Sequence, residues 1–353
     1  MSEASALFGV LSISDSRQLN KTAFCEIHKD FQNTFLPVIY VTVFAVGFSA
    51  NCLVLVSLSL KLRKWTSLDM FLFNLGLADL LYVITLPFLV VYYAMERRWT
   101  FGKAFCKMTR LLFHLNLYGS IGFLTCISVQ RYLGIVHPMK VLGRWNRRRS
   151  LLISLLVWGL VLAQTSADLR FTKTNLNGTK CHDTTVNEEL TDYLLYVQVI
   201  TVTGFAIPLL TIIASYCQIA VVLSRKNDLN STLKERSRNL AIVVMVVFSI
   251  CFTPYHVLRY LNLNFRHFQL KGLCARNTNT VYLLYQIARG MASLNSCIDP
   301  LVYLVARGDM LTKVKTFKNR LHLPLTSSKS NNCKIPQMIL NTDEMVIRKE
   351  TAV

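Results

Sequence analysis

Charged residues are scarce in this sequence. They make up 16% of the 353 residues, and hydrophobic residues make up 52%, whereas soluble domains carry about a quarter charged residues. The mean hydropathy is correspondingly positive, at +0.38. So little charge and so much apolar surface indicate a membrane protein rather than a soluble one.

Other absences exclude classes of function. Residues 279–304 contain no lysine, so the last apolar stretch cannot form the retinal Schiff base of an opsin-like light sensor or pump. The chain shows no internal repeat, which disfavours a transporter built from two related halves. No nucleophile, base and orienting group can be assembled from the apolar stretches. We therefore expect neither an enzyme nor a catalytic cofactor.

Seven apolar stretches reach the ~20 residues that a membrane-spanning helix needs. They cover residues 35–60, 69–95, 104–134, 150–170, 193–223, 237–262 and 279–304. The sequence therefore predicts an all-α membrane protein, with a seven-transmembrane helix bundle over residues 35–304.

Positive charge predicts the orientation of these spans. The net charge is +20, but the lysines and arginines lie in short segments between apolar stretches, so the anionic partner is the lipid bilayer and not nucleic acid. The loops after the first, third and fifth stretches are basic, for example at Arg63, Arg148 and Arg236, and basic loops face the cytoplasm. An odd number of spans then puts residues 1–34 outside the plasma membrane and the C-terminus inside the cell.

Features of the predicted outer side agree with this orientation. Two sequons, at Asn20 and Asn177, are expected to carry glycans. Residues 1–30 lack the apolar core of a signal peptide, so the first span is expected to direct its own insertion. Four cysteines also lie outside, where oxidising conditions favour disulfides. The residues alone leave all three possible pairings open for this set: Cys25, Cys106, Cys181 and Cys274.

A short motif in each span points to a known receptor family. The motifs are GFSAN with Asn51, NLGLADL with Asp79, SVQRY with Arg131, Trp158, Pro208 with Tyr216, FTPY with Pro254, and DPLVY with Asp299 and Tyr303. Over about residues 35–320 the chain resembles the rhodopsin-like (class A) G-protein-coupled receptors. The resemblance implies the disulfides Cys106–Cys181 and Cys25–Cys274. It also implies a G-protein coupling switch made of Arg131, Tyr216 and Tyr303, although Gln130 stands where an acidic residue is usual.

Polar residues in the middle of the spans need partners, because a lone carboxylate there is costly. One interpretation is a hydrogen-bond network with a protonated carboxyl. The other, implied by the resemblance, is a sodium ion with Asp79 as its principal ligand. The residues leave both open for this set: Asn51, Asp79, Ser120, Asn295 and Asp299.

Basic and aromatic residues recur at helical spacing in the outer halves of three spans. Like charges that point into one cavity repel each other unless an anion joins them. Guanidinium groups bind phosphate through paired hydrogen bonds, and aromatic rings offer faces for a nucleobase. The pattern predicts a phosphate-binding cavity lined by Arg110, Phe113, His114 and Tyr118 of the third span, His256 and Arg259 of the sixth, and Tyr282, Tyr285, Gln286, Arg289 and Ser293 of the seventh.

Longer segments narrow the resemblance. FHLNLYGSI, CHDTT, PYHVLRYLNL and YQIARGMASLNSCIDP resemble the metabotropic nucleotide receptors, the P-two-Y purinoceptors, and most of all their adenine-nucleotide branch. This implies that Asp183 joins the cavity residues in a site for ADP or ATP, and that Pro254 bends the sixth helix. It also implies signalling through Gq, phospholipase C and calcium. The alternative ligand is another small anion: a uridine nucleotide, a carboxylate metabolite or a lipid mediator.

The C-terminal region is predicted to lie in the cytoplasm. Residues 305–322 place apolar side chains on one side and basic ones on the other, which predicts a short amphipathic eighth helix on the inner leaflet. Residues 323–353 are polar and expected to be a disordered tail that recruits arrestin once phosphorylated. The final ETAV fits a PDZ-domain groove, which binds a terminal carboxylate and an apolar last side chain. The residues concerned are Thr351, Ala352 and Val353.

Overall fold

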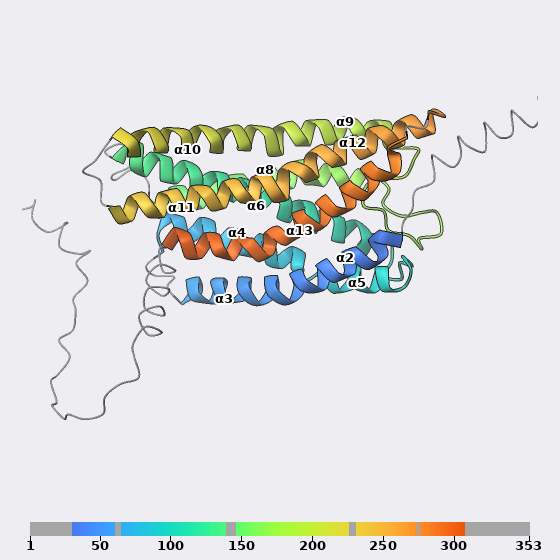
Figure 1. Ribbon diagram of the computed structural model, residues 1–353. Helices are drawn as coiled ribbons and strands as arrows, with labels where there is room; N and C mark the ends of the chain where they lie inside the picture. Colours follow the sequence, from blue (N-terminus) through green and yellow to red (C-terminus); the bar gives the residue numbers. More distant parts are fainter. Residues whose placement is uncertain (1–29, 61–64, 139–145, 226–230, 274–275, 308–353) are drawn as a thin grey trace, which may run out of the picture. The chain divides into compact units, whose positions relative to one another are not determined.

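The computed structural model describes residues 30–60, 65–138, 146–225, 231–273 and 276–307. Within these residues the chain forms helices joined by loops, with one isolated β-bridge between Thr174 and Cys181. The helices run side by side along a common direction (Figure 1). This confirms the predicted all-α fold class. Most of the predicted eighth helix and the whole of residues 323–353 lie outside the described residues.

The first two spans are each built from consecutive helical pieces. The first comprises α2 (Asp30–Thr42), a π-helical turn (Val43–Gly47) and α3 (Phe48–Ser59), and the second comprises α4 (Ser67–Val83) and α5 (Leu86–Ala94). Thr66 begins α4 with a capping box, because its hydroxyl accepts from the Asp69 N–H while the Asp69 carboxylate accepts from the Thr66 N–H. Pro87 stands in the first turn of α5, where a backbone N–H has no helical partner in any case.

The remaining spans follow the predicted order. The third is α6 (Lys103–Val136), and the fourth is α8 (Arg147–Ser166) with a 3₁₀ turn (Ala167–Arg170). The fifth comprises α9 (Leu190–Thr201), a π-helical turn (Val202–Ala206) and α10 (Ile207–Arg225). The sixth comprises α11 (Ser231–Val247), a π-helical turn (Phe248–Phe252) and α12 (Thr253–Leu270), and the seventh is α13 (Thr278–Arg307).

A π-helical turn ends two residues before the proline in the fifth and the sixth span. Pro208 and Pro254 have no N–H to donate, so the helix before each of them loses a hydrogen bond and adjusts locally. In the sixth span the carbonyl of Phe248 accepts both from the Thr253 backbone N–H and, at 2.8 Å, from the Thr253 hydroxyl. The irregularity therefore falls where the sequence predicts a bend at Pro254.

Six of the seven spans are long and apolar enough by themselves to cross a membrane. The seventh, α13, has 30 residues but is richer in polar side chains. These point inward, since Gln286, Arg289, Asn295 and Asp299 are all buried. By contrast, leucines such as Leu152 of α8 are exposed on the outer surface of the bundle, as lipid contact requires.

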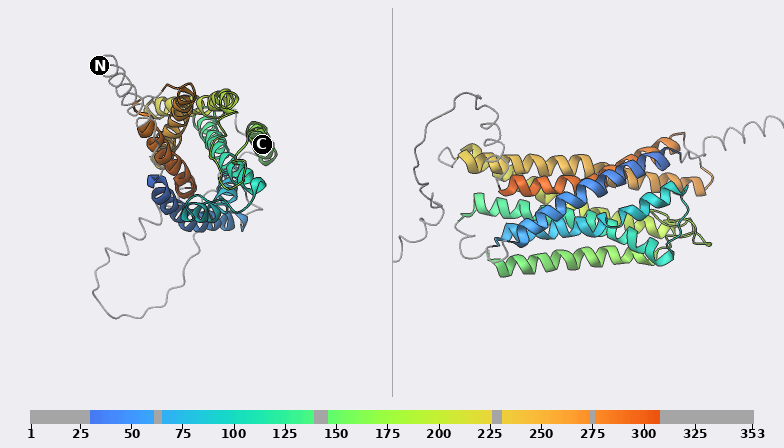
Figure 2. Two further views of the ribbon diagram at one scale, coloured as in Figure 1. Left: turned by 90° about the vertical axis from the view of Figure 1, so that its right-hand side faces the viewer. Right: turned by 90° about the horizontal axis from the view of Figure 1, so that it is seen from below.

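The third span is the centre of the bundle. Helix α6 contacts α4, α8, α10 and α11, and Figure 2 shows the helices of the bundle end-on. The loop of residues 171–189, called here the long loop, lies at the same end of the bundle as the start of α6 and the end of α12 (Figure 1). The predicted ligand-binding residues therefore lie beneath this loop.

Candidate functional site

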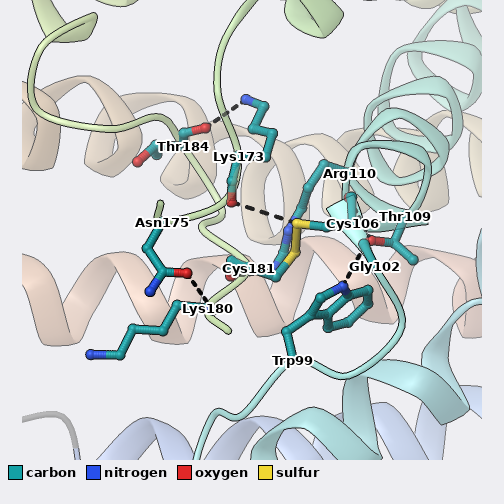
Figure 3. Close-up of a disulfide and its surroundings, with 10 residues drawn as sticks. All are labelled: Trp99, Gly102, Cys106, Thr109, Arg110, Lys173, Asn175, Lys180, Cys181 and Thr184. Atoms are coloured by element: carbon teal, nitrogen blue, oxygen red, sulfur yellow. Dashed lines mark hydrogen bonds between the residues drawn. A yellow bond between two sulfur atoms is a disulfide. The ribbon is translucent and has the colours of Figure 1, made fainter. Parts of the chain in front are cut away.

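The long loop is covalently tied to the first turn of α6. Cys106 and Cys181 form a disulfide with Cα atoms 5.8 Å apart (Figure 3). The bridge between Thr174 and Cys181 folds the loop back on itself, and the carbonyl of Thr179 accepts from the backbone N–H of Trp99 at 2.7 Å. Of the pairings that the sequence leaves open, the structure contains Cys106–Cys181. The other two cysteines of that set, Cys25 and Cys274, lie outside the described residues.

The loop brings one carboxylate, that of Asp183, onto the bundle. Arg289 of α13 donates from Nη1 to Asp183 Oδ2 at 2.8 Å and from Nη2 to the Tyr93 hydroxyl at 2.6 Å. Burial raises the pKa of the Asp183 carboxyl, but the positive charges of Arg289 and Arg110 outweigh burial and hold that pKa below its usual range. Asp183 is therefore an anion at neutral pH, already seated on an arginine that the sequence predicts to bind phosphate.

Three arginines from three helices are buried beneath the loop. Arg110 of α6, Arg259 of α12 and Arg289 of α13 expose only 5%, 1% and 3% of their surface. Each keeps one nitrogen without a hydrogen-bond partner among the described residues: Arg110 Nε, Arg259 Nη1 and Arg289 Nε. Because Arg289 alone of the three forms an ion pair there, the site holds an excess of positive charge and of unused donors. Such a site favours an anion.

Aromatic rings surround these guanidinium groups. The guanidinium of Arg259 lies 5.6 Å from the ring centroid of Tyr193 and 5.8 Å from that of Tyr255, and its Nη2 donates to the Tyr193 hydroxyl at 2.7 Å. Phe113 packs edge-on against Tyr255, with centroids 5.7 Å apart, and Tyr255 packs against Tyr285. The rings provide both cation–π contact and flat apolar surface.

Two further predicted residues keep free polar atoms in this region. His256 stacks on Phe205, with ring centroids 4.3 Å apart, and neither of its ring nitrogens has a hydrogen-bond partner among the described residues. Gln286 is 1% exposed, and its Oε1 is likewise unpaired there. Tyr118 lies deeper and packs against His256. These residues can therefore offer hydrogen bonds to a polar ligand.

The remaining predicted residues lie beside the arginines rather than among them. The Tyr282 hydroxyl bonds to the side-chain amide of Gln32 in α2 at 2.5 Å, and the Ser293 hydroxyl bonds to Tyr82 at 2.8 Å. His114 turns toward the fourth span, where its Nδ1 is 3.3 Å from Asp168 Oδ2. The structure thus brings the three arginines and their aromatic neighbours together and places these three side chains at the margin.

The cavity enclosed by these residues is almost closed. It has a volume of about 10 Å³, which is about the space of one water molecule, whereas sites for small ligands measure roughly 300–1,000 Å³. Its walls include Arg110, Arg289, Phe113 and Tyr285, and Asp183 also lines it. A ligand of nucleotide size therefore requires movement of the long loop or of the helices around it.

Comparison with known proteins places this arrangement in a family. Residues 50–303 match the family model of the seven-transmembrane receptors of the rhodopsin family. The chain is 41% identical over 333 residues to P-two-Y purinoceptor 1 of Gallus gallus, which covers 93% of this chain and 89% of the relative. This chain belongs to the P-two-Y purinoceptors of the rhodopsin family.

Other relatives agree with this membership. P-two-Y purinoceptor 1 of Homo sapiens is 40% identical over 319 residues, or 89% of this chain and 83% of the relative. P-two-Y purinoceptor 4 of Mus musculus is 40% identical over 285 residues, or 79% of this chain and 78% of the relative. The family consists of receptors, so this purinoceptor is a multi-pass plasma-membrane receptor and not an enzyme.

A buried polar network lies in the middle of this purinoceptor. Asp79 Oδ1 accepts from Asn116 Nδ2 at 2.7 Å, and Asn295 Nδ2 donates to Ser120 Oγ at 3.1 Å and to Asp299 Oδ2 at 3.3 Å. Asn51 is separate, because its amide donates to backbone carbonyls at Gly47 and Ser296. Within and beside this network, four oxygens have no hydrogen-bond partner among the described residues: Asp79 Oδ2, Asp299 Oδ1, Asn295 Oδ1 and Ser296 Oγ.

The predicted coupling switch lies at the opposite end of the receptor. Arg131 Nη2 donates to the carbonyl of Ala306 in the last turn of α13 at 2.6 Å. Tyr216 accepts from Ser128 at 3.1 Å, and Tyr303 bonds to Ser57 at 2.9 Å. Gln130 offers Arg131 no carboxylate, and its Oε1 has no hydrogen-bond partner among the described residues.

Several residues of these sites are absent from the sequence prediction. Tyr93, Tyr193 and Tyr255 line or hold the arginines, and the spacing of aromatic residues does not distinguish them from ordinary packing residues. Asn116 is the exception, because a polar side chain in mid-span two residues after His114 is a usable signal. The ion pair of Asp168 with Lys173 has no signal of this kind, since it joins the end of a span to a loop.

Proposed function

We propose that this receptor binds an extracellular adenine nucleotide, ADP or ATP, through its phosphates. The observation that supports this most strongly is the set of three buried guanidinium groups with unused donors beneath one loop carboxylate. Phosphate offers several acceptor oxygens to such donors, and Arg binds it through paired hydrogen bonds. The rings of Phe113, Tyr255 and Tyr285 supply apolar faces suited to the nucleobase or ribose.

Binding exchanges one anion for another at Arg289. In the closed site the Asp183 carboxylate occupies Arg289, and a phosphate group takes its place when the nucleotide binds. The exchange replaces one charge-assisted contact with a similar one, so displacement of Asp183 is not prohibitive. The free donors on Arg110 and Arg259 then gain partners, and this gain favours the nucleotide-bound state.

The basic loops of the sequence support an orientation in which this site is extracellular, with the long loop outside and Arg131 inside. Asn177 is exposed on the long loop, where a glycan at its sequon can be accommodated. Asn20, the other sequon, lies outside the described residues. Cys106 and Arg131 are 25 positions apart in one helix, which is roughly 37 Å at 1.5 Å per residue. The signal therefore travels along α6 and its neighbours.

At the cytoplasmic end the receptor engages a heterotrimeric G protein of the Gq class. Release of Arg131 from the Ala306 carbonyl frees a guanidinium at the end where the G protein binds.

Arrestin binds after phosphorylation of the tail, and a PDZ scaffold binds Val353. A receptor with one extra residue after Val353 tests the scaffold, because it should lose PDZ capture and keep calcium signalling. These tail residues lie outside the described residues.

The mid-membrane network is a candidate site for an allosteric sodium ion. Its unpaired atoms are all oxygens, including Asp79 Oδ2 and Asp299 Oδ1, and oxygens are the ligands that hard cations prefer. A proton shared between the two carboxyls is the alternative. If sodium binds there, replacing it with a large organic cation should raise agonist affinity in the unmodified receptor and leave Asp79→Asn unchanged. A proton would make both receptors insensitive to sodium.

A ligand panel on transfected cells tests the main proposal. ADP, ATP, UDP, UTP and small dicarboxylates are applied in turn while intracellular calcium is recorded. An adenine nucleotide should be the most potent, with no response in untransfected cells. A uridine nucleotide or a carboxylate as the most potent ligand would contradict the adenine assignment. A full response in cells without Gq-class proteins would contradict the coupling.

A further inference from the structure

The long loop contains a lysine that points into the protein instead of into solvent. Lys173 is 1% exposed, and its Nζ donates to Asp168 Oδ1, at the end of the fourth span, at 2.7 Å. Asp168 is also 1% exposed. Burial lowers the pKa of Lys173 to about 8, although the charge of Asp168 opposes this effect. A buried ion pair is costly to form, so its placement here needs a reason.

The same ammonium group holds the loop segment that carries Asp183. Lys173 Nζ donates to the carbonyl of Thr184 at 2.6 Å (Figure 3). On the other side of Asp183, the backbone N–H of His182 donates to the Lys173 carbonyl at 2.6 Å. The residues immediately before and after Asp183 are therefore both attached to Lys173, and Lys173 is attached to the fourth span through Asp168.

The surroundings of the ion pair belong to the anion site. The Lys173 ammonium lies 4.6 Å from the ring centroid of Tyr193, whose hydroxyl accepts from Arg259. His114 of α6 lies 3.3 Å from the other oxygen of Asp168, and the positive charges of Arg259 and Arg110 also lower the pKa of Lys173. The pair thus stands directly behind the arginines without lining their cavity.

We propose that Asp168 and Lys173 are positioning residues that hold Asp183 on Arg289 and so raise the nucleotide concentration needed to open the site. The proposal rests on the proposed function, in which phosphate displaces Asp183. A loop segment fixed at both neighbours of Asp183 presents its carboxylate to Arg289 with little freedom to leave. Loosening that segment weakens the internal competitor without removing any group that touches the nucleotide.

The test uses the full-length receptor with both charges of the pair removed. Asp168→Asn combined with Lys173→Met leaves no unpaired buried charge, whereas either single substitution does and can impair folding. Lys107→Met is the matched control, because Lys107 donates to the Leu169 carbonyl of the same region at 2.8 Å and is more exposed. Calcium responses to ADP are recorded at equal surface expression.

In the double variant, the ADP concentration for half-maximal response should be at least about 5-fold lower than in the unmodified receptor. This factor is the low end of typical coupling between two sites. Lys107→Met should show no such shift. In an Asp183→Asn background the same double substitution should add nothing further, because its effect passes through Asp183. A purely structural role predicts the opposite sign, a weaker response. Reduced or unchanged potency, or an equal gain in the Asp183→Asn background, would overturn the proposal.

A measurement without nucleotide separates this proposal from the proposed function. Hydrogen exchange of the amides in residues 181–185 is followed in purified receptor. The double variant should exchange faster there than the unmodified receptor, and Lys107→Met should match the unmodified receptor. If no nucleotide activates the unmodified receptor, the proposed function fails, and the exchange rates still decide whether the pair holds the loop. Unchanged exchange in the double variant would refute the positioning role in either case.

Discussion

Removal of the Arg289 side chain should weaken the nucleotide response by one to two decades. Arg289 is buried and donates to both Asp183 and Tyr93. A charge-assisted hydrogen bond is worth about 1.5–3 kcal/mol, and about 1.4 kcal/mol corresponds to tenfold in affinity. Arg289→Ala should therefore shift the concentration for half-maximal response by roughly 10- to 100-fold. In this variant Asp183 has no arginine partner and repels phosphate, so we expect a shift near the upper end of that 10- to 100-fold range.

The assay is a calcium dose–response curve with surface receptor measured in parallel by antibody labelling. Arg276→Ala is the control, because Arg276 is an exposed arginine at the same end of the receptor. Adding Asp183→Asn to Arg289→Ala should recover part of the loss, since it removes the uncompensated negative charge. An unchanged potency in Arg289→Ala, or an equal loss in Arg276→Ala, would refute the assignment of Arg289 to phosphate.

The same contacts predict the behaviour of other variants and conditions. Arg259→Lys should reduce ADP potency by less than about tenfold, because lysine keeps the positive charge and loses only the paired hydrogen bonds of the guanidinium. Cys106→Ser, Cys181→Ser and the double substitution should show one common defect in surface expression and potency, since each breaks the same bond. Because the Lys173 pKa is about 8, this ammonium is mostly charged at about pH 7.4 and largely neutral at about pH 9. ADP potency measured on membranes should rise over that interval in the unmodified receptor and stay flat in the double variant Asp168→Asn, Lys173→Met.

The helices of this receptor are largely predictable from its sequence. Hydropathy locates the spans because each must satisfy its backbone hydrogen bonds within the bilayer. The principal deviation is the sixth helix, which continues to Leu270, eight residues beyond the predicted end at residue 262. Its outer turns carry polar residues such as Arg266, which contacts Asn187 of the long loop instead of lipid. Hydropathy cannot extend a helix through such residues.

The sequence predicts the buried arginines of the candidate site, but it does not predict the loop contacts that close the site. Helical spacing places Arg110, Arg259 and Arg289 on inward faces, because such spacing is a local property of the chain. The loop that covers them is fixed by contacts between distant residues, such as Asp183 with Arg289 and Lys173 with Asp168. No periodicity in the sequence specifies those partners. The Cys106–Cys181 pairing is implied only by the family resemblance.

The closed loop and the distant switch can be connected through the third and seventh spans. Arg289 and Ala306 lie 17 positions apart in α13, roughly 25 Å at 1.5 Å per residue. The first holds the loop carboxylate and the second holds Arg131 of α6, while the disulfide joins that loop to the start of α6. The same two helices are thus linked at both ends by polar contacts that can break. A ligand that displaces Asp183 from Arg289 breaks the contact at the loop end of these helices. It can favour release of Arg131 from Ala306 at the other end only if it binds more tightly to the receptor in which Arg131 is free.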